Sequence, residues 1–460
     1  MITPPDKAKL SAEAKAFLDA NPDIEKFAML YTDLPGVQRG KLLTRAELLG
    51  AWENGRCLPG SVMSMDVTGR DVEETGLVWD DGDADRLVWP VPGTLVRTPW
   101  TLEAQAQYLG SFFELNAEGC LAEPRHALKR VVDRLGELGI TPVAAVELEF
   151  YLMDRDSALA GKPKPPRALN SSAVPMHWQA YFMPDLEDYA PFFRDLTAAT
   201  RLQGIPAEAL ISEYSPGQME IGLRHHDDAL KACDEAIMFK RAVKGVAEKH
   251  GLIASFMAKP YSAYSGSGMH LHVSLAGADG KNAFASDAAT ANPLLRHAIG
   301  GMKQTMGDAM AIFAPNANSY RRFRKSSYAP IAANWGVNNR TVSLRIPATS
   351  GAARHVEHRA SGADANPYLA LAAVLAGMHH GIVKSIDPGP PVEGNGYTQA
   401  CEPMPTNWFA ALERMRNSAF MKDYFGARFV EIFTTLKEIE ADRFFAEPQP
   451  LDFDFYLRTV

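Results

Sequence analysis

The sequence predicts an α+β protein built from two domains. Residues 56–100 are rich in Gly, Pro, Asp and Val and show no long helical pattern, which indicates a small, sheet-rich N-terminal unit. After about residue 115, strand-like and helix-like segments alternate, and GxGxxG and GxxxxGK[ST] are absent, so neither a Rossmann nor a P-loop site is indicated. A chain of 460 residues is also too long for one small core. We therefore expect an N-terminal domain over residues 1–115 and a larger domain over residues 116–460.

The elements of the N-terminal unit follow from local patterns. Apolar residues at helical spacing predict a helix over residues 11–29. The next segment, YTDLPGVQRGKLLT, predicts two strands separated by a turn at Asp33–Gly36. Just after the boundary, an amphipathic helix is expected from Pro124 to Gly139.

Composition excludes several classes of protein. With 47 Lys+Arg against 55 Asp+Glu, the net charge is −8 and no basic block stands out, so we expect no nucleic-acid partner. The most apolar stretch, Tyr368–Met378, is too short to span a bilayer, predicts a buried helix and gives no reason to expect a membrane partner. The start of the chain lacks the apolar core of a signal peptide. A reducing, cytoplasmic location is expected because the cysteines are scattered without a CxxC pair: Cys57, Cys120, Cys233 and Cys401.

Four glutamates stand on predicted strands of the larger domain. The segment TPVAAVELEFYL alternates with period two, so Glu147 and Glu149 share one strand face and lie about 6–7 Å apart. In ISEYSPGQMEIGL, the turn at 215–217 brings Glu213 and Glu220 to adjoining strand ends. Taken alone, each pair also fits a solvated strand face or an ordinary hairpin.

Histidines and arginines follow on later strands. In GSGMHLHVSL, His270 and His272 share a face, and the glycines before them let the backbone pass close to a ligand. A single HxH fits a metal site or a packed core. In NNRTVSLRIPATSGAARHVEHR, Arg345 opposes a buried strand face, and Glu357 and Arg359 share a face. Such arginines form solvated salt bridges or hold phosphate and carboxylate oxygens through forked hydrogen bonds.

These glutamates, histidines and arginines are able to line one cavity. Oxygen ligands with one imidazole suit Mg²⁺ or Mn²⁺ better than zinc. A cation would also relieve the mutual repulsion of clustered carboxylates. The combination is typical of phosphoryl transfer from a metal–ATP complex.

The chain resembles the glutamine synthetase superfamily from about residue 30 to its C-terminus. The resemblance rests on seven motifs in order: VELEFY, SEYSPGQMEI, GSGMHLHVS, NSYRRF, NNRTVSLRIP, VEHR and ANPYLALAAVLAG. It implies a β-grasp N-terminal domain, an antiparallel-sheet catalytic domain and a dodecamer of two hexameric rings with active sites between neighbouring subunits. It also implies the substrates L-glutamate, an amine and ATP, with two or more Mg²⁺ or Mn²⁺ ions per site. The γ-carboxylate of glutamate would attack ATP, and the amine would displace phosphate from the γ-glutamyl phosphate.

The resemblance assigns roles to matching positions. One metal ion would be held by Glu149, Glu213 and Glu220. A second metal ion, near the ATP phosphates, would be held by Glu147, His270 and Glu357, of which His270 would also face the substrate. Glutamate would be gripped by Arg322 and Arg359 and by the backbone of Gly266. The transferred phosphoryl group would be stabilised by Arg340 and Arg345. The nucleotide would lie near Ser274, Arg345 and Arg354.

Departures from the family pattern bear on the amine. Pro59, in LPGSV, stands where glutamine synthetases carry an Asp, and Tyr328, in SSYAP, stands where they carry a Glu. Ser265 also replaces an Asn. Ammonium needs acidic or acceptor groups to bind and to lose its proton. We therefore expect a larger amine, with a polyamine such as putrescine ahead of a methylamide- or ethanolamide-forming ligase, and both ahead of glutamine synthesis. Tyr328 would line the amine pocket or serve only in packing.

Two other classes compete with the ligase. A metal-dependent amidohydrolase built on His270 and His272 would need further ligands and would leave the arginines unused. Other histidines are numerous enough to supply these ligands, but none lies in a clear strand motif: His297, His355, His358, His379 and His380. A catalytically dead, ring-forming scaffold would have lost metal ligands, whereas all six expected ligand positions are present.

Overall fold

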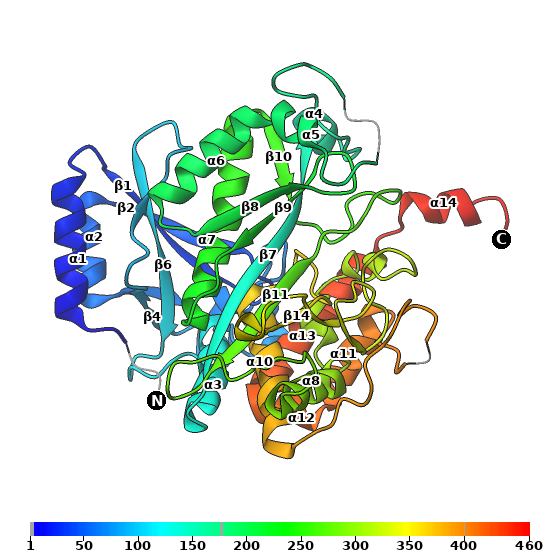
Figure 1. Ribbon diagram of the computed structural model, residues 1–460. Helices are drawn as coiled ribbons and strands as arrows, with labels where there is room; N and C mark the ends of the chain where they lie inside the picture. The colour runs from blue at the N-terminus through cyan, green and yellow to red at the C-terminus, as the bar shows by residue number, and fades with distance from the viewer. Residues whose placement is uncertain (1–3, 175–177, 400) are drawn as a thin grey trace.

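The computed structural model describes residues 4–174, 178–399 and 401–460 and has the predicted α+β architecture, with two separate sheets (Figure 1). The first sheet has six strands in the order β2-β1-β6-β4-β3, with β5 also paired to β6. Within it, β1 runs parallel to β6 and the other pairs are antiparallel. Its strands are β1 (Lys26–Thr32), β2 (Gln38–Thr44), β3 (Arg56–Pro59), β4 (Asp85–Pro90), β5 (Val96–Arg97) and β6 (Gln105–Phe113). Two helices accompany them, α1 (Lys7–Ala20) and α2 (Arg45–Asn54).

The second sheet carries the residues singled out in the sequence. Its eight strands follow the order β12-β13-β14-β11-β7-β9-β8, with β10 paired to β7. The expected antiparallel arrangement holds for every pair except β12 and β13, which run parallel. The strands are β7 (Thr141–Asp154), β8 (Ala207–Ser212), β9 (Gln218–Leu223), β10 (Leu252–Ser255), β11 (Met269–Ala276), β12 (Trp335–Val337), β13 (Leu344–Ile346) and β14 (Val356–His358).

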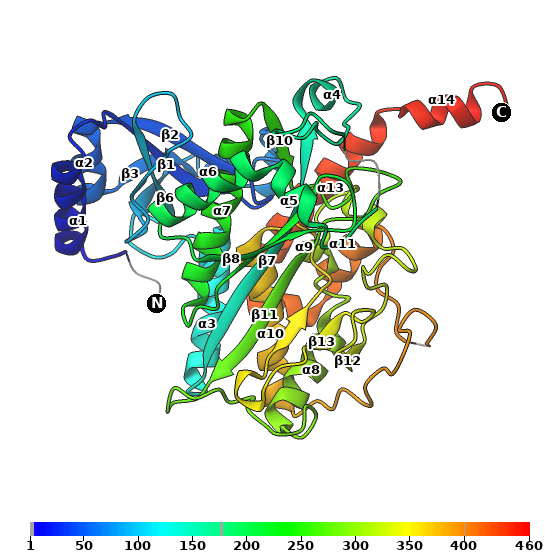
Figure 2. The same cartoon turned by 45° about the horizontal axis from the view of Figure 1, so that its top comes forward.

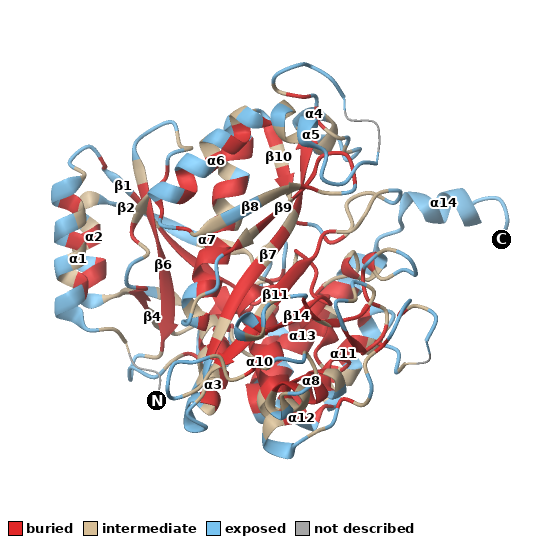
Figure 3. Ribbon diagram, viewed as in Figure 1, coloured by how far each residue is buried: buried red, intermediate tan, exposed pale blue. Residues whose placement is uncertain are grey.

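Helices pack against the second sheet, behind it and below it as viewed in Figures 1 and 2. The predicted apolar helix is α10, whose residues Tyr368–Met378 are buried at the centre of the helical layer (Figure 3). Within the described ranges, no helix has the length and hydropathy needed to cross a membrane. The helices are α3 (Pro124–Glu137), α4 (Arg155–Leu159), α5 (Met183–Asp188), α6 (Ala190–Leu202), α7 (Ala229–Lys249), α8 (Pro293–Thr305), α9 (Met310–Phe313), α10 (Pro367–Lys384), α11 (Trp408–Asn417), α12 (Ala419–Phe425), α13 (Ala427–Ala446) and α14 (Pro450–Tyr456).

The N-terminal elements correct one expectation. The predicted helix over residues 11–29 ends at Ala20, and the strand β1 begins at Lys26. Pro22 disfavours a helical conformation at Asn21 and has no N–H to continue the hydrogen-bond ladder. Phe27 is therefore buried as part of a strand and not of a helix. The turn at Asp33–Gly36 between β1 and β2 is confirmed, with the Asp33 carboxylate accepting a hydrogen bond from the Val37 N–H at 2.7 Å.

The start of α10 ties the two sheets together. Asn366 caps this helix by accepting a hydrogen bond from the Tyr368 N–H at 3.1 Å. Its side-chain amide donates in turn to the Asp33 carbonyl at 3.0 Å, in the turn between β1 and β2. The predicted boundary near residue 115 falls between the last strand of the first sheet and α3, and it stays a prediction.

Candidate active site

The register of the second sheet lines up the acidic and basic residues on one face. On the inner strands, Glu149 of β7 lies opposite Glu220 of β9, and Glu147 lies opposite His270 of β11. Further along, His272 pairs with Glu357 of β14, and Glu357 pairs with Arg345 of β13. Because alternate residues of a strand share a face, these side chains form one continuous band across the sheet.

The centre of this band is a network of glutamates and histidines. His270 Nδ1 lies 2.6 Å from Glu147 Oε1 and 3.6 Å from Glu357 Oε1. His272 Nε2 lies 3.4 Å from the second oxygen of Glu147. Burial alone would raise the pKa of Glu147, but the contacts with both histidines hold that pKa well below its usual range.

The second group of carboxylates is mutually repulsive. Burial, followed by the charges of Glu147, Glu149 and Glu213, raises the pKa of Glu220 to about 11. Burial also raises the pKa of Glu149 and of Glu213. Glu149 accepts a hydrogen bond from the Gly268 N–H at 2.8 Å, which lowers the pKa of Glu149 by less than burial raises it. Acidic groups held together in this way are suited to share a cation.

Two arginines surround Glu357, which is 1% exposed. Arg345 donates to Glu357 Oε2 at 2.8 Å, and Arg359 donates to Oε1. Burial opposes the charged form of Glu357, but Arg359 and the two histidines lower its pKa to about 2. The Nε atoms of Arg345 and Arg359 are buried without a hydrogen-bond partner among the described residues, so both guanidiniums keep a donor for an anionic ligand.

Arg322 and the glycine-rich segment before β11 close another side of the site. Arg322 is buried on a short helical turn, Ser319–Arg322, and donates to the carbonyls of Ala360 and Arg359. A Cβ at Gly266 would lie 2.7 Å from Arg322 Cγ, and one at Gly268 would lie 2.8 Å from Nε2 of His270. Only glycine permits this close approach.

The donor set fits divalent cations with oxygen-rich coordination. Two groups have ligand atoms that all lie within 4.8 Å of one another: Glu147, His272 and Glu357, and Glu147, Glu220 and His270. Carboxylate oxygens with one imidazole per group suit Mg²⁺ or Mn²⁺. A bound cation would also relieve the repulsion among these carboxylates, which together with burial raises the pKa of Glu220.

Other predicted site residues lie at the edge of this band. Arg340 is exposed in the turn before β13 and lowers the pKa of Glu213, against the larger effect of burial. The Tyr328 side chain is exposed, and its carbonyl accepts a hydrogen bond from Arg359 at 3.4 Å. Ser274 follows His270 and His272 on the same face of β11. The Arg354 guanidinium donates to the carbonyls of Ser286 and Asp287, so it anchors a loop.

A histidine cluster extends the band beyond the predicted ligands. His272 Nδ1 lies 3.1 Å from Nε2 of His355, and the His225 ring packs against both. The HxH motif marked His272 in the sequence, whereas its pairing with Glu357 depends on the register of two strands 85 residues apart, which no local pattern reveals. No sequence signal marked His225.

Comparisons with known proteins agree with this geometry. The glutamine synthetase catalytic domain family matches residues 121–456. The chain is 40% identical to gamma-glutamylputrescine synthetase PuuA of Escherichia coli (strain K12), over 94% of this chain and 91% of the relative. It is 35% identical to glutamate–isopropylamine ligase of a Pseudomonas species, over 90% and 91%. A solved GmaS–ADP complex superposes with a TM-score of 0.84 and 27% identity, covering 97% of this chain and 99% of that chain. The chain therefore belongs to the glutamine synthetase family.

Proposed function

We propose that the protein is an ATP-dependent ligase that joins the γ-carboxylate of L-glutamate to an organic amine. The observation that carries this proposal is the band of side chains across the second sheet. In this band, carboxylates and imidazoles suited to divalent cations lie directly beside the buried Arg359 and the partly buried Arg345. Binding of ATP phosphates and of an amino acid requires both kinds of group.

In this proposal, different residues of the site hold cations, stabilise the phosphoryl group and face the nucleotide. Glu149, Glu213 and Glu220 hold one Mg²⁺ or Mn²⁺ ion, and Glu147, His270 and Glu357 hold a second. Bound cations would neutralise charge on the ATP phosphates and polarise the γ-phosphoryl group. Arg345 and Arg340 stabilise the charge that develops on this group, and Ser274 and Arg354 lie toward the nucleotide.

The glutamate would be oriented by Arg322, Arg359 and the backbone of Gly266. A γ-carboxylate oxygen attacks the γ-phosphorus, the bond to the bridging oxygen breaks, and ADP leaves. The amine nitrogen then attacks the carbonyl carbon of the γ-glutamyl phosphate, loses a proton and expels inorganic phosphate. The Nε donors of Arg345 and Arg359 are buried and have no hydrogen-bond partner in the part of the chain that the structure describes, so they are available to the anionic oxygens of these species.

The amine is proposed to be a polyamine such as putrescine. Pro59 and Tyr328 replace two acidic residues that an ammonium ion would need. The Escherichia coli and Pseudomonas relatives, a putrescine and an isopropylamine ligase by name, both handle organic amines. A monoamine ligase that forms methylamides or ethanolamides is the second candidate, and glutamine synthesis from ammonium is the third.

An amine panel tests this function directly. With ATP, Mg²⁺ and glutamate, phosphate release is expected to be fastest with putrescine, and kcat/KM for ammonium is expected to be lower by about 100-fold or more. Hydroxylamine should trap the acyl phosphate as a hydroxamate. Amide hydrolysis or formation without ATP would contradict the ligase, and equal kcat/KM for ammonium and putrescine would contradict the amine assignment.

We further propose the dodecamer of two rings, with the catalytic site completed by a neighbouring subunit's N-terminal domain. The C-terminal helix α14 projects away from the body of the chain (Figure 1). Its side chains Leu451, Phe453 and Phe455 are each 56% exposed, which is unusual for apolar residues unless they bind another surface. The four cysteines are free, which fits the cytoplasm.

Removing residues 448–460 is expected to break the assembly into smaller species. The reason is that the assembly would lose the apolar surface that α14 is proposed to bury against another copy. Light scattering of the full-length and shortened chains measures the change in mass. A shortened chain that keeps the full assembly would show that α14 plays no part in it.

A further inference from the structure

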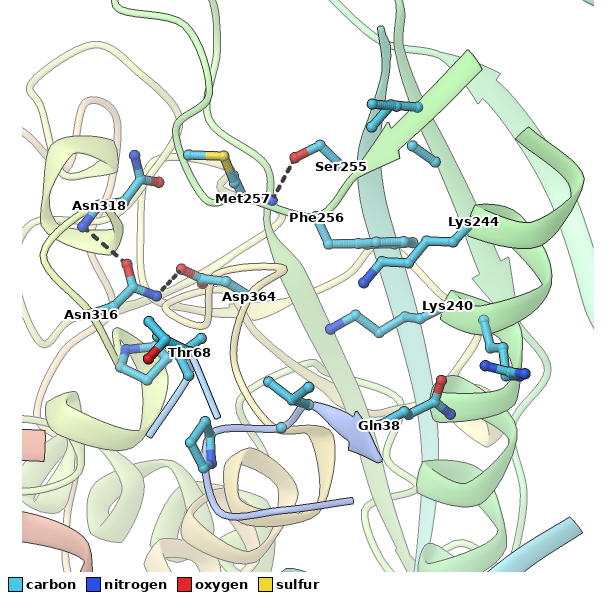
Figure 4. A pocket seen from close by; sticks show the side chains of 18 of the residues that line it. Gln38, Thr68, Lys240, Lys244, Ser255, Phe256, Met257, Asn316, Asn318 and Asp364 are labelled. Atoms are coloured by element: carbon cyan, nitrogen blue, oxygen red, sulfur yellow. Dashed lines mark hydrogen bonds between the residues drawn. The ribbon is translucent and has the colours of Figure 1, made fainter. Parts of the chain in front are cut away.

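A large cavity, seen from close by in Figure 4, is lined by residues of both the N-terminal and the larger part of the chain. Its volume is about 1590 Å³. On one side it is lined by the turn Gly36–Gln38 after β1 and by the loop around Thr68, and on the other by α7, by residues 253–257 and by residues 315–318. None of the residues proposed above to hold cations, glutamate or phosphate lines it. A ligand in this cavity would therefore be distinct from the substrates.

Two lysines reach into the cavity from the same face of α7. Lys240 and Lys244 are one helical turn apart, and both side chains point into the open space in Figure 4. Lys240 donates to the Ala363 carbonyl at 2.7 Å. Neither ammonium forms an ion pair with any carboxylate in the part of the chain that the structure describes. Both lie above the Phe256 ring, at 5.2 Å and 5.8 Å from its centroid.

Three of the other basic residues around the cavity form ion pairs with carboxylates. Lys249 pairs with Asp195 at 3.0 Å, Lys437 with Glu440 at 3.0 Å and Arg443 with Asp66 at 2.6 Å. The Asp364 carboxylate accepts hydrogen bonds from Asn316 and Ser319. The lining acid Glu248 is exposed. Among the described residues, Lys240 and Lys244 are thus two neighbouring positive charges that form no ion pair, and the Asp364 carboxylate acts on Lys240 only from beyond ion-pair distance.

The surroundings of the two lysines disfavour their charged forms. Burial, together with the charge of Lys244, lowers the pKa of Lys240 to about 7, and burial lowers that of Lys244. An unpaired ammonium group that is largely removed from solvent, as that of Lys240 is, is unfavourable unless an anion joins it. The cavity also offers apolar contact to such an anion, because Trp100 packs on Gly245 of α7, where an added Cβ would lie 2.4 Å from the indole.

We propose that this cavity binds a small organic dianion, a phosphate monoester or a dicarboxylate, whose charged group bridges Lys240 and Lys244 and whose carbon skeleton rests against Phe256 and Trp100. Lysines act as point charges and do not require the planar geometry of a carboxylate, so the shared chemistry is the double negative charge. Gln38 and Ser255 add polar groups on opposite sides of the cavity (Figure 4). Because the walls come from both sheets, the ligand would connect the N-terminal and catalytic parts of the chain.

Calorimetric titration of the full-length protein with phenyl phosphate and, separately, with benzene-1,3-dicarboxylate tests the proposal. The wild type is expected to bind at least one probe at one site per chain. Lys244→Met and Lys240→Met are each expected to weaken this binding by about tenfold or more, the loss of one charge-assisted contact. Lys244→Arg keeps the charge and should stay within about threefold of wild type. The probe that binds more tightly identifies the anionic group.

Lys231→Met is the matched control, since Lys231 lies on the same helix, is exposed and does not line the cavity. Lys244 is exposed toward the cavity, so its replacement tests the site even where Lys240→Met does not fold. Binding of neither probe to the wild type would overturn the proposal. Undiminished affinity in the Lys244→Met chain would overturn it as well. Neither result bears on the ligase, whose activity is measured with the amine panel.

Discussion

Replacing Glu357 by alanine is expected to abolish turnover, with kcat reduced by about three orders of magnitude or more. Glu357 is buried between Arg345 and Arg359 and lies 3.6 Å from His270. The substitution removes a proposed cation ligand and leaves the guanidiniums of the buried Arg359 and the partly buried Arg345 without their counter-charge. Breaking such a buried pair also costs about 3–5 kcal/mol of stability. Phosphate release that depends on ATP, glutamate and amine measures the loss.

A second variant separates the loss of charge from the loss of packing. Glu357→Gln keeps the volume and one acceptor oxygen, so it should fold and still fail to turn over. Glu413→Ala, on the exposed face of α11, is the control for a carboxylate removed elsewhere and should keep wild-type kcat. Thermal unfolding of all three variants shows which of them are folded. A folded Glu357→Gln chain with wild-type kcat would contradict the role given to this residue.

The strands and their acidic residues could be predicted because period-two alternation fixes the face on which each side chain lies. Glu147 and Glu149 are partly exposed on β7, whereas Val146, Leu148 and Phe150 are buried, as the alternation requires. The order of the strands in the sheet has no such local signal. The resemblance to the family implied only that the sheet is antiparallel, and the observed register accounts for why Glu149 and Glu220 face each other.

Other features were missed for identifiable reasons. Residues 44–47, TRAE, carry the capping-box pattern that starts α2, with Thr44 and Glu47 bonded to each other's backbone, so a search for helix starts would have found this helix. The helix predicted over residues 11–29 ignored Pro22, which ends α1 early. Lys240 and Lys244 gave no signal at all, because lysines one turn apart are what any solvated helix face displays. Only the three-dimensional structure shows that they border a cavity.

Removing divalent cations is expected to abolish amide formation and to lower the Tm of the protein. Without a cation, Glu220 has a pKa of about 11, because burial and the charges of its carboxylate neighbours disfavour ionisation. A cation that binds only the folded state stabilises it by about 2.7 kcal/mol at a concentration 100 times its Kd. For a chain of this size, that corresponds to a Tm rise of several degrees. Melting curves recorded with EDTA, Mg²⁺ or Mn²⁺ measure this rise.

Glu220→Gln provides the decisive comparison for the cation site. Glutamine has nearly the shape of the protonated glutamate, so the cation-free variant should melt at the wild-type temperature or above it, relieved of the carboxylate repulsion. Its melting temperature should no longer respond fully to Mn²⁺, and its turnover should fall with the loss of a ligand. A Glu220→Gln chain that keeps the whole Mn²⁺-induced increase would place the cation elsewhere. A variant that melts well below the cation-free wild type would instead show that the ionised Glu220 carboxylate stabilises the fold.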